Sequence, residues 1–256
     1  MRDGFIKIAA ATPDLHVADC EYNAAEIVNQ AKQAAARGAK LITFPELCLT
    51  GYTCGDLFLQ QALQKTAERA IVSLLEVSAE LELLTLVGLP VGIDGKLYNC
   101  AAVIQNGAVL GVVPKTVLPN YGEFYEKRQF SSGTDYRGEN TIRLAGCDVP
   151  FGRDLLFCCR ELPEYKLAVE ICEDLWVAAP PSTRHAIAGA TVLGNCSASD
   201  ETIGKAEYRR SLVTGQSARL MAGYLYADAG RGESTTDMVF AGHNLIAENG
   251  KLLAQT

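Results

Sequence analysis

Histidine is scarce in this chain of 256 residues, and that scarcity argues against a metal centre. The three histidines are His16, His185 and His243, and none has another histidine two or four residues away. Zinc sites in proteins usually draw their ligands from closely spaced histidines and cysteines. We therefore expect no metal site.

The nine cysteines lack the spacing of zinc or thiol-disulfide sites. Cys158 and Cys159 are adjacent, and Cys48 and Cys54 are six residues apart, so neither pair forms a Cys-x-x-Cys motif. An odd number of cysteines does not suit a disulfide framework, and the N-terminal residues do not resemble a signal peptide. We expect a reduced, cytoplasmic protein in which the cysteines other than Cys172 are core or pocket-wall residues.

Long apolar runs and positive charge are also missing. No run approaches the roughly 18–20 apolar residues that cross a membrane, and the formal net charge of −7 argues against a nucleic-acid surface. The short charged runs Glu126-Lys127-Arg128 and Arg209-Arg210 are interpreted as solvated charge or intramolecular ion pairs. We expect neither a membrane nor a nucleic acid as a partner.

Hydrophobic patterning predicts one α/β domain, because a chain of this length can bury a large core. Asn106-Gly107 predicts a tight hairpin turn between strands 98–105 and 108–113. The order of elements mixes βαβ units with hairpins, which predicts two mixed sheets face to face with helices outside. Further strands are expected at 5–10, 40–44, 83–88, 141–144, 155–159, 166–171, 191–194, 224–227, 237–240 and 245–247, with helices at 23–37, 60–83, 182–188 and 205–221.

Three reactive side chains each follow a short apolar run that reads as a buried strand. Glu46 follows KLITF, Lys115 follows AVLGVV, and Cys172 follows KLAVEI. Side chains at strand ends converge on one rim of a stacked α/β sheet, so we expect these three residues to share one site. Taken singly, each has an ordinary structural explanation: a turn glutamate, a solvated lysine and a buried cysteine.

The three residue types together suit nucleophilic catalysis. Cysteine attacks as a thiolate, so it needs a base for its proton and a cation to hold the charge. Glu173 and Asp174 would raise the pKa of a neighbouring thiol by repulsion, and Lys115 would offset that effect. We assign Glu46 as general base and Cys172 as nucleophile, with Lys115 and the Glu173 N–H stabilising the tetrahedral intermediate.

Several longer segments resemble a known family. FPELCLTGY, VVPKTVLPNYGEFYEKRQF, EICEDLW and NCSASDETIGKAEYRR resemble the nitrilase, or carbon-nitrogen hydrolase, superfamily over nearly the whole chain. TGYTCGDLF, EICEDLWVAAPPS and GESTTDMVFAGHN are similar to its branch in the glutaminase domain of glutamine-dependent NAD synthetase. The resemblance implies an αββα four-layer sandwich.

The same resemblance implies the reaction and further site residues. Glutamine would be hydrolysed through a γ-glutamyl thioester, with no metal or organic cofactor. Glu123 would position Lys115 and the substrate amide, and Lys205 would pair with the substrate α-carboxylate, although the family often has arginine at that position. The residues that would line the pocket are Tyr121, Phe124, Glu173, Ser199 and Lys205.

The resemblance also implies a partner domain. The Ser-Gly-Gly-x-Asp-Ser loop of the ATP-using synthetase domain does not occur here, so residues 1–256 are expected to be a single hydrolase domain, with ATP and Mg expected only on the missing synthetase domain. The family suggests a homo-oligomer. Segments 118–134 and 230–236 are expected to be functional or partner-ordered loops. Two alternatives remain open: a stand-alone amidase acting on another small amide, and a non-catalytic oligomerisation module.

Overall fold

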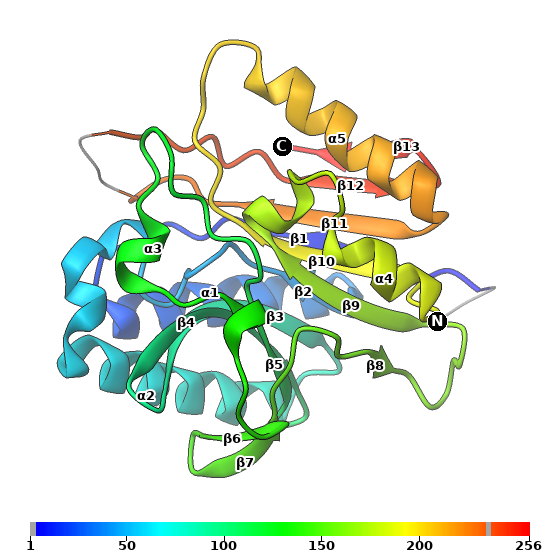
Figure 1. The fold of residues 1–256 in the computed structure, drawn as a ribbon. Coiled ribbons are helices and arrows are strands. Elements are labelled where there is room, and N and C mark those ends of the chain that lie inside the picture. The colour runs from blue at the N-terminus through cyan, green and yellow to red at the C-terminus, as the bar shows by residue number, and fades with distance from the viewer. Residues whose placement is uncertain (1–3, 234–236) are drawn as a thin grey trace.

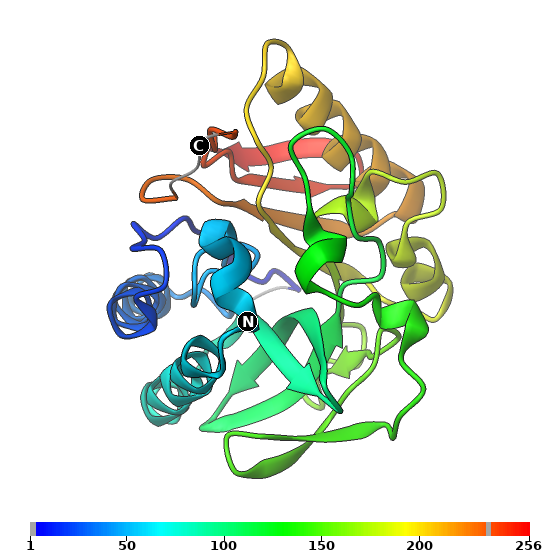
Figure 2. The same cartoon turned by 60° about the vertical axis from the view of Figure 1, so that its left-hand side comes forward.

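The chain folds into four layers, helices, sheet, sheet and helices, in a computed structural model that describes residues 4–233 and 237–256 (Figures 1 and 2). The first sheet has the strand order β1-β2-β3-β4-β5, in which β1 to β3 run parallel and β3 to β5 antiparallel. Its strands are β1 (Ile8–Ala10), β2 (Leu41–Thr43), β3 (Leu84–Ile93), β4 (Lys96–Gln105) and β5 (Ala108–Pro114).

Helices α1 (Cys20–Ala36) and α2 (Gln61–Ser78) pack against one another beside this sheet, as Figure 2 shows. Their apolar positions recur every three or four residues, so each helix presents one buried face. Asp19 begins α1 because its carboxylate accepts the N–H of Tyr22, which otherwise has no acceptor within the helix.

The second sheet has the order β13-β12-β11-β10-β9-β8. Strands β9 to β11 run parallel, and α4 (Pro181–Ile187) and α5 (Lys205–Leu220) cover its outer face (Figure 1). The strands are β8 (Phe157–Cys158), β9 (Lys166–Ile171), β10 (Val192–Ser197), β11 (Gly223–Asp228), β12 (Leu245–Glu248) and β13 (Lys251–Gln255). The remaining elements are a β6–β7 hairpin (Thr141–Leu144 and Cys147–Pro150), α3 (Glu126–Gln129) and the 3-10 turns η1 (Tyr52–Leu59), η2 (Gly133–Asp135) and η3 (Cys172–Leu175).

Alternation along β9 decides what each face of the second sheet meets. Leu167, Val169 and Ile171 pack in the core between the two sheets, whereas Ala168 faces the core beneath α4 and α5. Glu170 shares the helix side with Ala168, because successive residues of a strand point to opposite faces. A buried carboxylate therefore lies two residues before Cys172 and on the far side of the sheet from the sheet-to-sheet core.

Gly88 lets the loop that carries Glu46 pack directly on the first sheet. A Cβ at this glycine would collide with the backbone nitrogen of Leu47 and would lie 2.6 Å from the carbonyl oxygen of Pro45. No side chain fits in that space. The absence of a side chain at Gly88 thus determines how closely the loop that carries Glu46 approaches the sheet.

Most predicted elements are present with small shifts of their ends. The Asn106-Gly107 turn is confirmed, with φ of 50° and 76°, and the predicted ranges Thr141–Leu144 and Lys166–Ile171 are confirmed. The helix predicted over 60–83 ends at Ser78, whose hydroxyl donates to the carbonyl of Leu75. The strand predicted over 237–240 is wrong, because only Phe240 pairs, through a single bridge to Asp200.

The prediction for the cysteines holds in part. All nine are free and lie in the described part of the chain, and five of the eight besides Cys172 are buried. Cys147 and Cys158 are exposed, so placing them in the core was wrong. Cys147 follows the tight β6–β7 turn, and Cys158 lies on β8, the short edge strand of the second sheet. Edge positions leave one side chain in two facing solvent.

Neither a membrane-crossing helix nor a metal-ligand cluster is found over residues 4–233 and 237–256. No helix there is long and apolar enough to span a bilayer. No group of three or more His, Cys, Asp or Glu side chains there is arranged to hold a metal ion.

Candidate active site

The structure brings Glu46, Lys115 and Cys172 together at the ends of strands in the two facing sheets. Glu46 lies in the turn after β2, Lys115 directly follows β5, and Cys172 directly follows β9. Lys115 Nζ lies 2.6 Å from Glu46 Oε1, and both charges act on the Cys172 thiol. All three side chains are buried, with exposed fractions of 0%, 1% and 6%.

Cys172 occupies a strained elbow between β9 and η3. Its φ is 43°, in the left-handed region that non-glycine residues rarely adopt. Its backbone N–H donates to Asn195 Oδ1 at 3.0 Å. The next N–H, that of Glu173, belongs to the second residue of the 3-10 turn η3, where the first N–H groups have no acceptor within the turn. A sharp elbow of this kind presents a nucleophile beside backbone donors.

The surroundings of Cys172 favour a protonated thiol. Burial raises the pKa of Cys172 well above its ordinary value, and the nearby Glu46 carboxylate raises it further. Lys115 opposes both effects, as do hydrogen bonds with Ser197 and the backbone of Ala198. Burial and Glu46, rather than the adjacent carboxylates predicted from the sequence, are the leading causes. Attack therefore needs a base that removes the thiol proton.

Glu46 has the properties of that base. Burial raises its pKa to about 8, although Lys115 lowers it. Its Oε1 accepts hydrogen bonds from Lys115 and from Asn99 Nδ2, both at 2.6 Å. Its Oε2 has no hydrogen-bond partner among the described residues. One oxygen thus holds the carboxylate in place and the other is left to take a proton.

Glu126, not Glu123, makes the second carboxylate contact to Lys115. Glu126 Oε1 lies 2.5 Å from Lys115 Nζ, and Glu126 is only 4% exposed. Over the described residues, no hydrogen bond or ion pair joins Glu123 to Lys115. Glu126 lies three residues after Glu123, on the short helix α3, and makes the kind of contact expected of a residue that positions Lys115. A contact of Glu123 with substrate stays a prediction.

Glu126 is itself held by an aromatic hydroxyl from η1. Tyr52 donates its hydroxyl to Glu126 Oε1 at 2.9 Å. The start of η1 is fixed in turn by Glu233, whose carboxylate accepts the N–H groups of Tyr52 at 2.6 Å and Thr53 at 3.1 Å. The predicted loop 230–236 thus supports the site through Glu233, while residues 234–236 lie outside the described residues.

Asp174 ties the loop after Lys115 to the loop after Cys172. Its Oδ1 accepts the N–H and hydroxyl of Thr116 and the N–H of Val117, while Oδ2 accepts the N–H of Ile171 at 3.0 Å. The charge of this buried side chain is therefore satisfied by hydrogen bonds. Burial raises the pKa of Asp174, and these bonds oppose the rise.

Aromatic and acidic side chains lie together at Glu173, the residue that follows Cys172 in the chain. Tyr121 is 58% exposed and donates its hydroxyl to Glu173 Oε1 at 2.9 Å. Phe124 is buried and packs edge-on against the Tyr121 ring. Burial raises the pKa of Glu173, and the Tyr121 hydrogen bond opposes that rise. The structure therefore places these three predicted residues next to one another.

Lys205 and Ser199 are already engaged with other side chains. Lys205 forms an ion pair with Asp200, and its ammonium lies 5.8 Å from the centroid of the Phe124 ring. Ser199 is buried, and its hydroxyl accepts a hydrogen bond from Arg209 at 3.1 Å. A role for the Ser199 hydroxyl in substrate binding stays a prediction.

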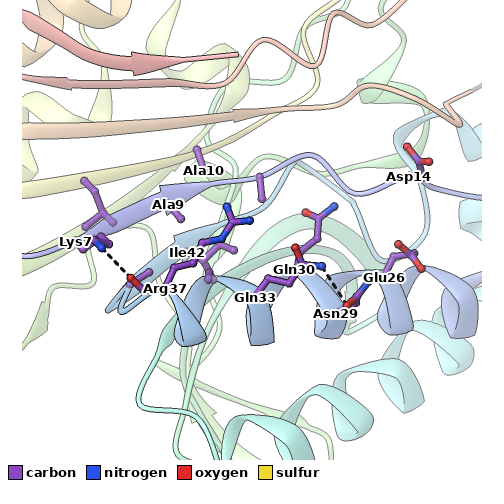
Figure 3. A pocket seen from close by; sticks show the side chains of 14 residues that line it. Lys7, Ala9, Ala10, Asp14, Glu26, Asn29, Gln30, Gln33, Arg37 and Ile42 are labelled. Atoms are coloured by element: carbon purple, nitrogen blue, oxygen red, sulfur yellow. Dashed lines mark hydrogen bonds between the residues drawn. The ribbon is translucent and has the colours of Figure 1, made fainter.

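A sizeable pocket of the described structure lies away from this chemistry. A pocket of about 610 Å³ runs between β1 and α1, with Lys7 and Arg37 near one end and Asp14 and Glu26 near the other (Figure 3). The Lys7 ammonium donates to the Arg37 carbonyl there. None of the three reactive residues lines this pocket. The convergence of buried charges, and not this pocket, therefore locates the site.

Sequence reasoning missed three residues that complete the site. Asn99 lies inside the predicted strand 98–105, and Asn195 lies one residue beyond the predicted strand 191–194. Neither position was therefore marked as a site residue. Glu126 lies in a charged run that was interpreted as solvated charge or ion pairs, and the ion-pair interpretation is the one confirmed. A usable signal was the Asn in each otherwise apolar strand, since a buried amide needs partners.

A sequence profile of the family described as "Carbon-nitrogen hydrolase" matches residues 7–256. The chain belongs to the carbon-nitrogen hydrolase family. Membership agrees with the four-layer fold and with the elbow at Cys172.

Relatives and solved structures narrow the comparison. The chain is 49% identical over 253 residues to "Glutamine-dependent NAD(+) synthetase" of Mycobacterium tuberculosis, a match that covers 99% of this chain and 37% of that protein. A glutamine-dependent NAD(+) synthetase from Cytophaga hutchinsonii superposes with a TM-score of 0.83 at 33% identity, covering 98% of this chain and 40% of that one. The chain thus spans about two fifths of the length of these proteins.

A more distant structure shares the fold alone. A mutant of the amidase from Nesterenkonia sp. AN1 superposes with a TM-score of 0.78 at 18% identity, covering 100% of this chain and 88% of that one. In that protein the acetamide moiety of fluoroacetamide is attached to the active-site cysteine.

Proposed function

We propose that this chain hydrolyses the side-chain amide of glutamine through a thioester on Cys172. The observation that carries the proposal is the buried Glu46–Lys115 pair, 2.6 Å apart, whose charges act on a thiol held in a strained elbow. The names of the relatives that match the whole chain supply the substrate.

Acylation uses Glu46 twice, first as a base and then as an acid. Glu46 Oε2 accepts the thiol proton as Cys172 Sγ forms a bond to the amide carbon. The carbonyl oxygen becomes an oxyanion, which the Lys115 ammonium and the Glu173 N–H stabilise. Glu46 then gives its proton to the amide nitrogen, the carbon–nitrogen bond breaks, and ammonia leaves.

Deacylation repeats these steps with water. Glu46 accepts a proton from a water molecule whose oxygen attacks the thioester carbon. The carbon–sulfur bond breaks, the thiolate regains the proton from Glu46, and glutamate leaves. Neither a metal nor an organic cofactor takes part in this scheme.

The charged side chains Glu173, Asp200 and Lys205 suit a zwitterionic amino-acid end. Lys205 offers a cation for the α-carboxylate, while Asp200 and Glu173 offer anions for the α-ammonium group. Because Lys205 is paired with Asp200 in the free site, substrate binding would exchange one ion pair for two. Lysine cannot form the two-pronged contact of arginine, so the carboxylate would be held as a point charge.

In the wider proposal the ammonia serves NAD synthesis from nicotinic acid adenine dinucleotide. A synthetase domain, covalent or separate, would use ATP and Mg and receive the ammonia. The proposal includes a cytoplasmic location and a homo-oligomer. What supports it is that relatives more than twice as long carry the synthetase name and match this chain along 99% of its length.

A substrate panel tests the function directly. We expect release of ammonia and glutamate from glutamine, with kcat/KM far above the values for asparagine, acetamide and the α-amide of glutamate. Preference for a simple aliphatic amide would favour the alternative of a stand-alone amidase. Absence of hydrolysis in this chain and in the protein joined to a synthetase domain would favour the non-catalytic oligomerisation module and would rule out our proposal.

A further inference from the structure

A chain of hydrogen bonds runs from the backbone of Cys172 to a buried carboxylate behind the second sheet. The Cys172 N–H donates to Asn195 Oδ1 at 3.0 Å, and Asn195 Nδ2 donates to the Tyr224 hydroxyl at 3.0 Å. The Tyr224 hydroxyl donates to Glu170 Oε1. The reaction scheme above uses none of the last three side chains.

The chain of hydrogen bonds crosses three neighbouring parallel strands. Glu170 lies on β9, Asn195 on β10 and Tyr224 on β11, and Glu170 and Asn195 are directly paired in register. The Glu170, Asn195 and Tyr224 side chains are 1%, 0% and 0% exposed. A buried polar chain of this kind is costly unless every member is satisfied.

Glu170 is anchored at its far end as well. Its Oε2 accepts the N–H of Ser182 at 2.8 Å, at the start of α4. The Ser182 hydroxyl accepts Nε2 of Gln216 from α5 at 2.9 Å. The carboxylate therefore connects the outer helices to the strand that carries Cys172.

The direction of the hydrogen bonds is dictated by Glu170. An ionised carboxylate only accepts, so the Tyr224 hydroxyl must donate to it. The Tyr224 oxygen then accepts from the amide nitrogen of Asn195, which leaves the amide oxygen facing the Cys172 N–H. Only this orientation of the Asn195 amide gives that N–H an acceptor.

Two consequences follow for the nucleophile. The N–H of Cys172 is occupied, so it is withheld from the oxyanion, which leaves the Glu173 N–H and Lys115 as donors. The occupied N–H also holds the residue at φ 43°, because the peptide plane before Cys172 cannot rotate without losing its acceptor.

We propose that Glu170, Tyr224 and Asn195 are positioning residues that orient the Cys172 nucleophile by fixing the direction of this hydrogen-bond chain. The inference rests on the proposed function for its kinetic consequence. It is independent of which amide is the substrate.

Exchanging donor and acceptor groups along the chain of hydrogen bonds distinguishes an effect of hydrogen-bond direction from an effect of packing. In Glu170→Gln, the Ser182 N–H requires the new amide oxygen, so the amide nitrogen faces Tyr224. Either the Tyr224 hydroxyl proton or the Cys172 N–H then loses its acceptor. In Asn195→Asp, two carboxylates face the single proton of Tyr224. Each substitution keeps the shape of the side chain and breaks the chain of donors and acceptors.

The double variant Glu170→Gln with Asn195→Asp restores complementarity in reverse. The amide nitrogen at 170 donates to Tyr224, and Tyr224 donates to one carboxylate oxygen at 195. The other oxygen at 195 accepts the Cys172 N–H. The net charge and side-chain shapes match those of the parent, so any recovery of activity in the double variant reports the direction of the hydrogen bonds alone.

The experiment measures kcat and KM for glutamine, the rate of Cys172 alkylation by iodoacetamide, and Tm. Burial raises the pKa of Glu170 to about 7, so the assays are made at pH 8.5, where it is ionised. Tyr224→Phe is compared with Tyr165→Phe, whose buried hydroxyl has no hydrogen-bond partner among the described residues.

We expect Glu170→Gln, Asn195→Asp and Tyr224→Phe each to lower kcat and the alkylation rate by about tenfold or more, with KM within about twofold, since a misplaced nucleophile costs rate rather than binding. Tyr165→Phe should leave both rates unchanged. The double variant should recover about tenfold over the poorer single variant. The proposal would be overturned if the double variant showed no higher kcat or alkylation rate than the poorer single variant. It would also be overturned if kcat were equal in the parent and all these variants.

Alkylation separates this inference from the proposed function. If the parent protein fails to hydrolyse glutamine but the double variant restores the alkylation rate, the positioning chain stands and the substrate assignment falls. If glutamine is hydrolysed and the double variant restores neither rate, the positioning chain falls and the function stands.

Discussion

Asp174 accepts a hydrogen bond from the Thr116 hydroxyl at 2.6 Å, which fixes the loop that follows Lys115 against the elbow that carries Cys172. The two loops come from different sheets, 58 residues apart in the chain. Because the same carboxylate also accepts the Ile171 N–H, it holds the two loops in a fixed position relative to each other. One buried side chain thereby joins the loop that follows Lys115 to the elbow that carries Cys172.

Removal of the nucleophile gives the first prediction. Cys172→Ala should abolish glutamine hydrolysis while the protein stays folded, because no covalent route remains. Activity and Tm are measured beside those of Cys158→Ser, a change at an exposed cysteine that should alter neither. A glutamine-like electrophile should add one equivalent to the parent protein, and peptide mapping of the adduct to Cys48, Cys54 or Cys196 would contradict the assignment.

The second prediction concerns pH. The general base must be deprotonated, and the pKa of Glu46 is raised to about 8, so kcat/KM should rise as the pH increases from 6 to 9. The apparent value belongs to the buried Glu46–Lys115 pair rather than to Glu46 alone, because the two groups lie 2.6 Å apart. Neither Cys172 nor Lys115 should produce a fall in that range, because both pKa values lie well above their ordinary positions.

Glu46→Gln isolates that rise. The variant should lose about 10² in kcat, in line with the loss of a general base, and its residual rate should no longer increase between pH 6 and 9. Asp14→Asn, on the far pocket of Figure 3, serves as a carboxylate control. A profile of the same shape in Glu46→Gln as in the parent would assign the rise to another group.

The third prediction contrasts two glutamates. Glu126→Gln should lower kcat by about tenfold or more, because the ammonium of Lys115 loses one of its two charged partners. Glu123→Gln should leave the Lys115 environment intact and change KM more than kcat, if Glu123 meets substrate as the resemblance implies. A larger kcat loss in Glu123→Gln than in Glu126→Gln would reverse these roles.

The reactive residues could be predicted from sequence because local pattern decides where strands end. Glu46, Lys115 and Cys172 each follow an apolar run that forms a buried strand, and the ends of these strands, β2, β5 and β9, meet where the two sheets face each other. The contacts of Glu126 and Asn195 could not be predicted in this way. They depend on side-chain direction across segments 11 and 23 residues apart, which a short helix and strand register decide.

Apolar composition misled at residues 237–240. A run that includes Met238, Val239 and Phe240 predicts a strand, but a strand forms only where a neighbour offers a ladder of partners. Of residues 237–240, only Phe240 forms a β-bridge, and its partner is Asp200. The apolar composition of this segment favours a strand, but the lack of a neighbouring strand to pair with among the described residues keeps it from forming one.

The fourth prediction tests Asp174 as the structural tie between the loops. Asp174→Asn replaces one accepting oxygen with a donor, so at least one of the N–H groups of Thr116, Val117 and Ile171 loses its acceptor in a buried place. An unsatisfied buried donor costs about 1–3 kcal/mol, and the free energy of unfolding in urea should fall by that amount. Asp148→Asn, at an exposed ion pair with Arg143, should leave the unfolding curve unchanged. Because the tie also joins the loop that follows Lys115 to the elbow that carries Cys172, kcat should fall in Asp174→Asn under conditions where the protein is fully folded. Equal unfolding curves for Asp174→Asn and the parent would show that the four hydrogen bonds do not hold the two loops together.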